Sequence, residues 1–129
     1  MRMLLAISLS AVLYSPAFAA DPASGEQVFK VCAACHAIGP NAKNKLGPEL
    51  NGIAGRTWGA VAGFNYSSDL AEGKASGKVW DEATLDKYLE NPKAVAPKGK
   101  MPYTGLKDAA KRGDLIAYLK QFDAAGNKK

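Results

Sequence analysis

The chain has 129 residues, two cysteines, one histidine and a formal net charge of +5 at pH 7. This length fits a single domain with a modest hydrophobic core. The composition disfavours a structural zinc site, because such a site takes four cysteine or histidine ligands and the chain has three such residues. The basic charge is compatible with nucleic acid, a membrane surface or an acidic protein as partner.

The first residues have the pattern of a cleavable secretory signal peptide. Arg2 precedes an apolar stretch over 3–14, and small residues around Ala19 suit cleavage. The stretch is well short of the roughly 20 residues that span a bilayer, which argues against a membrane anchor. We expect a signal peptide over 1–19, cleaved between residues 19 and 20 or between 20 and 21, and one domain over 20–129. The mature chain is expected in the periplasm, with a formal charge of +4 because all 12 acidic residues remain.

The first predicted helix carries the motif with the most specific chemistry. It begins at a capping box formed by Ser24 and Gln27, and its helical spacing continues up to Cys35. The run Cys32-Ala33-Ala34-Cys35-His36 is the pattern for covalent attachment of c-type haem. On a helical turn both cysteines lie on one face and reach the same porphyrin, and His36 then becomes an axial ligand of the iron.

Two other interpretations of this motif remain open. A thioredoxin-like redox pair requires a preceding strand, whereas the residues before Cys32 show no strand alternation. A plain disulfide suits an exported protein, but it leaves the adjacent His36 without a role. We expect one haem c, attached through Cys32 and Cys35.

A long loop and a short helical turn follow the motif. The sequence from 37 to 63 is rich in glycine, proline and asparagine and lacks periodicity, which indicates a loop wrapped over the haem. A short helical turn is predicted to start at Ser67 or Ser68 and to run to about Glu72.

Two longer helices are predicted downstream. The first is capped by Asp81, carries a hydrophobic staple between Trp80 and Leu85, and stops at Asn91-Pro92. The second runs from about residue 108 to residue 122 and is followed by Gly126. Their buried faces are predicted to consist of Leu85, Tyr88 and Leu89 in the first helix, and Leu115, Ile116, Leu119 and Phe122 in the second.

Met101 is the candidate for the second axial position of the iron. The mature chain has no second histidine, and the other two methionines leave with the signal peptide. Met101 lies in a proline- and glycine-rich loop over 96–105, which lacks the helical period of a core residue. An open iron, or one ligated by Lys98 or Lys100, is the alternative. Two protein ligands leave no coordination site for a substrate, which predicts an electron carrier rather than an enzyme.

Taken together, the motifs along the chain are more specific than the attachment motif alone. They include Gly47-Pro48, Gly55-Arg56, Trp80, the stretches 88–93 and 114–120, and Lys100-Met101. With them, nearly the whole mature chain resembles class I cytochrome c, and within it the soluble bacterial cytochromes related to the mitochondrial protein. The resemblance implies an all-α class I cytochrome c fold, with three main helices, short helical turns and long loops wrapped around one covalently attached haem. A monomer is expected.

The resemblance also implies roles for matching residues around the haem. The carbonyl of Pro48 accepts a hydrogen bond from His36 and fixes its tautomer. In the family, the positions that match Arg56, Tyr66 and Trp80 donate hydrogen bonds to a buried haem propionate. Tyr88 matches the family tyrosine whose hydroxyl lies near the methionine sulfur. In the family, the two terminal helices cross at a contact made by four residues. The matching residues here are Gly25, Phe29, Leu115 and Tyr118.

The chain departs from the family pattern at two places in the Met101 loop. Many relatives have Gly-Thr where this chain has Lys98-Gly99, which puts one propionate contact in doubt and predicts a more mobile loop. Tyr103 stands where relatives usually have phenylalanine at the haem edge.

The resemblance implies docking to acidic redox partners through lysines around the haem edge. The candidates are Lys30, Lys45, Lys93, Lys98 and Lys100. The expected function is one-electron transfer in the periplasm, from a quinol-oxidising cytochrome bc complex to a terminal oxidase or a photosynthetic reaction centre. Export and a redox cofactor disfavour nucleic acid. The alternatives are a haem enzyme or small-gas-binding protein with a displaceable methionine ligand, and an electron-entry domain of a larger complex.

Overall fold

The computed structural model describes residue 11 and residues 19–129. The predicted signal peptide, 1–19, lies almost entirely outside the described residues, so its cleavage stays a prediction. Within the part that is described, no helix has both the length and the apolar composition needed to cross a bilayer.

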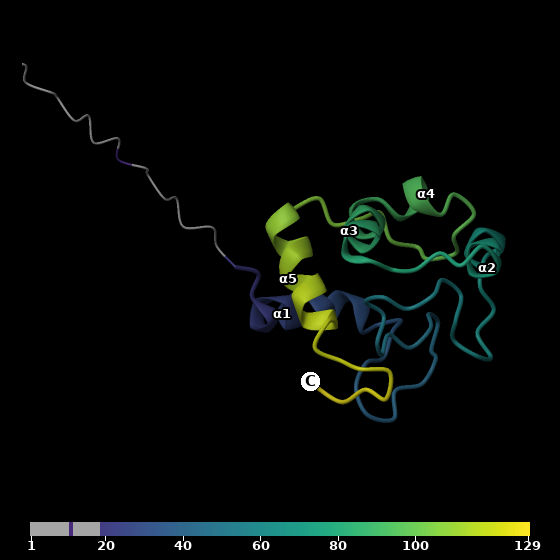
Figure 1. The fold of residues 1–129 in the computed structure, drawn as a ribbon, viewed down its shortest axis with the longest axis horizontal. Helices are drawn as coiled ribbons and strands as arrows, with labels where there is room; N and C mark the ends of the chain where they lie inside the picture. The colour runs from purple at the N-terminus through teal and green to yellow at the C-terminus, as the bar shows by residue number, and fades with distance from the viewer. Residues whose placement is uncertain (1–10, 12–18) are drawn as a thin grey trace, which may run out of the picture.

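Over residues 19–129 the chain forms five helices, most of them separated by loops (Figure 1). They are α1 (Pro22–Cys32), α2 (Ser68–Ala75), α3 (Glu82–Glu90), α4 (Pro92–Val95) and α5 (Ala109–Leu119). Over residues 19–129 the backbone forms no strand, apart from two isolated bridges that join Thr57 to Val79 and Phe122 to Lys128. The predicted all-α class is confirmed. So is the long loop after the attachment motif, since no helix occurs between α1 and α2.

Helix α1 begins earlier than the predicted capping box. Asp21 is the N-cap, and its carboxylate accepts a hydrogen bond from the backbone N–H of Ala23 at 3.1 Å. Pro22 occupies the first helical position, where its fixed φ and missing N–H are favourable. The predicted capping box was therefore wrong. Ser24 lies inside the helix, and its hydroxyl donates to the carboxylate of Asp21 instead of accepting from a backbone N–H at the helix start.

Helices α1 and α5 pack directly on each other, as the resemblance implied (Figure 1). A Cβ added at Gly25 would lie 1.9 Å from the carbonyl oxygen of Asp114, so the backbones approach too closely for any side chain. The rings of Phe29 and Tyr118 lie beside this contact, with centroids 5.3 Å apart. The backbone N–H of Asp21 also donates to the carboxylate of Asp114 at 2.8 Å, which ties the start of α1 to α5.

The remaining helices agree with the predicted starts more closely than with the predicted ends. Helix α2 starts after Ser67, as predicted, but continues past Glu72 to Ala75. Helix α3 is capped by Asp81, whose carboxylate accepts from Thr84 N–H at 2.8 Å. Pro92 does end α3, and it also begins the short helix α4, which the sequence analysis missed.

Helix α5 ends at Leu119, before the predicted end at residue 122. Phe122 is nevertheless buried, with 6% of its surface exposed, because the chain turns there and bridges to Lys128. Phe122 therefore reaches the core from a turn rather than from the helix.

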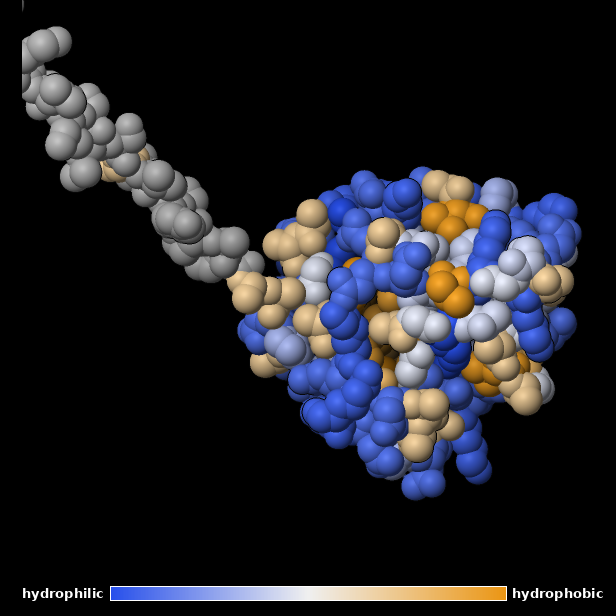
Figure 2. Space-filling model, viewed as in Figure 1, coloured by the Kyte–Doolittle hydropathy of each residue, from blue (hydrophilic) through white to orange (hydrophobic). Residues whose placement is uncertain are grey.

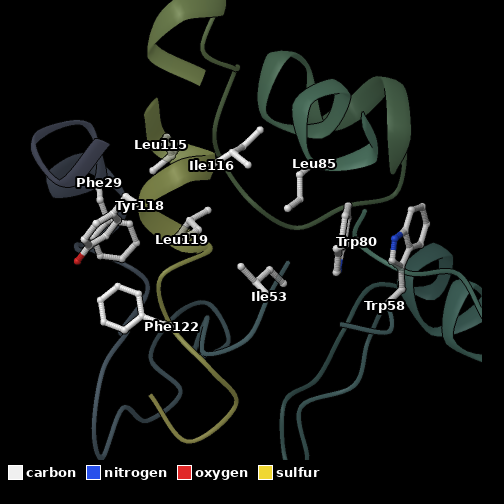
Figure 3. Packing of buried hydrophobic residues seen from close by; sticks show 10 residues of the cluster. All are labelled: Phe29, Ile53, Trp58, Trp80, Leu85, Leu115, Ile116, Tyr118, Leu119 and Phe122. Atoms are coloured by element: carbon white, nitrogen blue, oxygen red, sulfur yellow. The ribbon is translucent and has the colours of Figure 1, made fainter. Parts of the chain in front are cut away.

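The hydrophobic core extends from the α1–α5 crossing to a pair of tryptophans (Figure 3). At one end, aromatic rings of α1 and α5 pack together, and Trp58 and Trp80 stack at the other, with centroids 4.7 Å apart. Ile53, Leu85 and Leu119 lie between these two groups (Figure 3). Apolar surface also remains visible among the hydrophilic side chains of the outer face (Figure 2).

Candidate functional site

The candidate site is a cavity of about 520 Å³ beside this core. Its lining is mostly apolar and comes from α1, α2, α3, α5 and the loops between the helices. Cys32, Cys35, His36 and Met101, which are far apart in sequence, all line it. The volume lies within the range of about 300–1,000 Å³ that is typical of cofactor and ligand pockets.

The attachment motif lies where α1 ends. Cys32 is the last residue of the helix, and its carbonyl accepts hydrogen bonds from Cys35 N–H at 3.1 Å and His36 N–H at 2.9 Å. This turn places both cysteines on the cavity wall. The two cysteines form no disulfide with each other. Burial raises the pKa of Cys32, which keeps its thiol protonated.

His36 is held in one tautomer by the loop that follows it. Its Nδ1 lies 2.7 Å from the carbonyl oxygen of Pro48, which can only accept, so the ring proton belongs on Nδ1. Burial lowers the pKa of His36, although the bond to Pro48 opposes the shift, so the ring is neutral at pH 7. Nε2 therefore keeps a free lone pair, which a metal ligand requires.

Gly47 forms the surface against which the His36 ring packs. A Cβ added there would lie 2.3 Å from Cε1 of the imidazole and 2.7 Å from Nδ1. The absence of a side chain at this position therefore allows the ring to reach the Pro48 carbonyl.

Arg56 lines the cavity with part of its hydrogen-bonding capacity unused. Its guanidinium donates to the carbonyls of Asn51 and Glu49, each at 3.0 Å, and lies 3.5 Å from the Glu49 carboxylate. Its Nε is buried without a partner. A buried cationic donor without an acceptor is costly, and the carboxylate of a haem propionate would satisfy it.

The other two predicted propionate donors also line the cavity. The hydroxyl oxygen of Tyr66 accepts from Val61 N–H at 3.0 Å, which leaves its own proton for another acceptor.

Trp58, which was not predicted from the sequence, stacks on Trp80. The indole N–H of Trp58 is buried without a partner, and Lys78 Nζ lies 4.9 Å from the centroid of its ring. Its position in a glycine-rich loop gave no periodic signal.

Met101 reaches the cavity from the loop between α4 and α5. Tyr88, on α3, lines the same space, and burial, with a smaller contribution from the charge of Asp69, raises its pKa to about 12. Tyr88 is therefore a neutral hydroxyl donor at pH 7. Tyr103 is half-buried at the cavity.

The predicted docking lysines are all exposed. Lys45 Nζ donates to the carbonyl of Ala33 at 2.7 Å, within the attachment motif. Lys93 Nζ donates to the carbonyl of Gly99, and Lys100 lines the cavity. Two apolar residues on the cavity rim, Val31 and Leu46, were not predicted from the sequence, and they are 69% and 84% exposed.

Taken together, these features fit a covalently attached haem. The apolar cavity brings two thiols, a neutral imidazole and a thioether to one space, and Arg56 offers an unpaired donor for a carboxylate. Two cysteines are what covalent attachment of a c-type haem requires, and imidazole and thioether are ligand types that its iron takes.

Comparison with known proteins agrees with this geometry. The family model described as cytochrome c matches residues 22–123. The chain is 49% identical over 128 residues to cytochrome c2 of Blastochloris viridis, covering 99% of this chain and 98% of that protein. It is 53% identical over 107 residues to cytochrome c-550 of Ancylobacter novellus, covering 83% of this chain and all of that protein. The solved structure of cytochrome c2 from Rhodospirillum centenum superposes with a TM-score of 0.74 at 40% identity, covering 80% of this chain and 98% of the other.

Proposed function

Because the chain belongs to the cytochrome c family, with a class I fold and one covalently attached haem c, we propose that it is a periplasmic one-electron carrier with His36 and Met101 as axial ligands. The observation that carries the proposal is the single cavity that both side chains line. The iron of the bound haem supplies the redox change, between the ferric and the ferrous state.

The residues of the chain divide the work of holding this group. Cys32 and Cys35 would anchor it by thioether bonds, and Pro48 keeps the lone pair of His36 Nε2 available. Arg56, Tyr66 and Trp80 would hold a propionate, while Tyr88 lies at the same cavity as Met101. With both axial positions taken by the protein, no site is left for a substrate, so the chain is proposed to be a carrier and not an enzyme.

A visible spectrum with added carbon monoxide tests this function. The holoprotein should show a low-spin spectrum with a methionine-to-ferric-iron band, and the reduced form should not change when carbon monoxide is added. Ready binding of carbon monoxide would overturn the carrier proposal and favour a haem enzyme or gas-binding protein.

We further propose that the cavity rim docks onto acidic redox partners. Val31 and Leu46 expose apolar surface there, and Lys45 and Lys100 lie beside it. Charges of this kind speed the encounter without tight binding, which a shuttle needs because it must also leave. The proposed donor is a cytochrome bc complex, and the proposed acceptor is a terminal oxidase or a photosynthetic reaction centre.

The rate of electron transfer to such an acidic partner is expected to fall as salt rises. Between low salt and physiological salt the Debye length shrinks from about 30 Å to about 8 Å, which screens the lysine charges. Stopped-flow kinetics would measure the rate, with Lys111→Gln, on the outer side of α5, as a control for a lysine outside the rim. Lys45→Gln, on the rim, should slow electron transfer more than Lys111→Gln does. A rate that does not change with salt, or an equal change of rate in the two variants, would contradict docking through the rim.

A further inference from the structure

The loop that carries Met101 has no regular secondary structure between α4 and α5, so isolated contacts fix its position, among them the backbone bond from Leu106 N–H to the carbonyl of Leu89 at 2.8 Å. After Met101, the buried guanidinium of Arg112 holds the loop. It donates to the carbonyls of Leu106 at 3.0 Å and Lys107 at 3.1 Å, and to the Asp86 carboxylate at 2.8 Å. The segment before Met101 needs a separate anchor.

Two contacts supply that anchor: Lys93 Nζ donates to the carbonyl of Gly99, and the first turn of α2 holds the preceding residue. The carboxylate of Asp69 accepts a hydrogen bond from the backbone N–H of Lys98 at 2.7 Å, across 29 residues of sequence. The next residue, Gly99, has no side chain to make such a contact, and its own N–H donates to the carbonyl of Ala96 at 2.9 Å. Lys100 Nζ lies 3.4 Å from the carbonyl of Asn65, which is a longer and weaker tie to the same region.

The Asp69 carboxylate is itself held in place. Ser67, which is 4% exposed, donates its hydroxyl to Asp69, although Ser67 is the N-cap of α2 and could have capped the helix. Leu70 N–H donates to the same oxygen at 3.0 Å. Burial alone would raise the pKa of Asp69, but these bonds and the one from Lys98 lower it, so the group is a carboxylate at neutral pH.

We infer that Asp69 is a positioning residue for Met101: by holding the main chain at Lys98, it keeps the thioether directed at the haem iron and closes the iron to external ligands. This rests on the proposed ligation by Met101. Without the carboxylate, the segment between Ala96 and Met101 opens more often, and the iron is exposed in proportion to that opening.

Imidazole binding to the ferric holoprotein measures this opening, because imidazole must displace Met101 before it binds. Apparent affinity then scales with the fraction of open molecules. A hydrogen bond to a charged group is strong enough that its loss should change this fraction by about tenfold. We therefore expect Asp69→Ala to raise the apparent imidazole affinity about tenfold, and Asp69→Asn, which keeps an acceptor oxygen, to raise it less.

Asp123→Ala is the matched control. The Asp123 carboxylate also accepts two backbone N–H groups, from Ala125 and Asn127, each at 2.9 Å, but in the C-terminal turn. Its removal should leave imidazole affinity unchanged. Hydrogen exchange at the Lys98 amide should quicken in Asp69→Ala and stay as in the wild type in Asp123→Ala.

The outcomes separate this inference from the function on which it rests. An unchanged imidazole affinity in Asp69→Ala, or an equal rise in Asp123→Ala, would overturn the positioning role. A wild-type protein that lacks the methionine-to-iron band would overturn ligation by Met101 itself, and the positioning role with it.

Discussion

Replacing Met101 with alanine is expected to lower the reduction potential and to let the ferrous protein bind carbon monoxide. The thioether is a soft ligand that favours the ferrous state, and no other methionine remains in the proposed mature chain. Axial ligands set haem potentials over a range of about 0.8 V, so a fall of about 0.1 V or more is expected. Redox titration and the carbon monoxide spectrum would measure the two effects.

Lys98→Ala and Lys100→Ala, made separately, are the controls for this experiment. Each removes a nitrogen that could ligate the iron, and neither removes the Lys98 backbone N–H that Asp69 holds. Their potentials should stay close to that of the wild type. If Met101→Ala kept the wild-type potential while one lysine variant lost it, the axial ligand would be that lysine.

Replacing Gly47 with alanine is expected to displace His36 and to abolish the low-spin spectrum in most of the holoprotein. The new Cβ would lie 2.3 to 2.8 Å from three atoms of the imidazole, so the ring must move away from the Pro48 carbonyl. Overpacking of this kind costs about 1–3 kcal/mol even where no ligand is involved. The absorbance spectrum and thermal unfolding of the variant would show both effects.

Gly113→Ala, on α5, is the matched substitution. There the added Cβ would meet a single atom, the Cβ of Ala20, at an ordinary contact distance of 3.9 Å. Alanine is also the better helix former, by up to about 1 kcal/mol relative to glycine. This variant should therefore keep the low-spin spectrum and unfold at no lower temperature than the wild type. A normal spectrum in Gly47→Ala would contradict the role of Gly47 in seating the histidine.

Local signals in the sequence were enough to predict the helix starts at Ser67 and Asp81 and the loop after the attachment motif. Each of these depends on residues within a few positions of one another, as in the cap that Asp81 provides to Thr84. The start of α1 was predicted wrongly because Ser24 and Asp21 can both cap a helix. Pro22 decides between them by favouring the first helical position.

The features that the sequence did not reveal depend on distant partners. The bond from Lys98 N–H to Asp69 involves a backbone group, which is the same for nearly every residue type and so gives no sequence signal. Trp58 is buried by stacking on Trp80, 22 residues further along the chain. The apolar rim at Val31 and Leu46 becomes visible only when the loop folds back beside α1.

The packing of α1 against α5 also determines when the fold can close. Asp21 and Asp114, whose hydrogen bond spans 93 residues, lie near the two ends of the described domain. When the chain appears with its N-terminus first, the face of α1 that carries Gly25 therefore cannot be buried until α5 has followed. Until then the segment that carries Cys32 and Cys35 lacks its packing partner, so both thiols stay accessible for haem attachment in the unfinished chain.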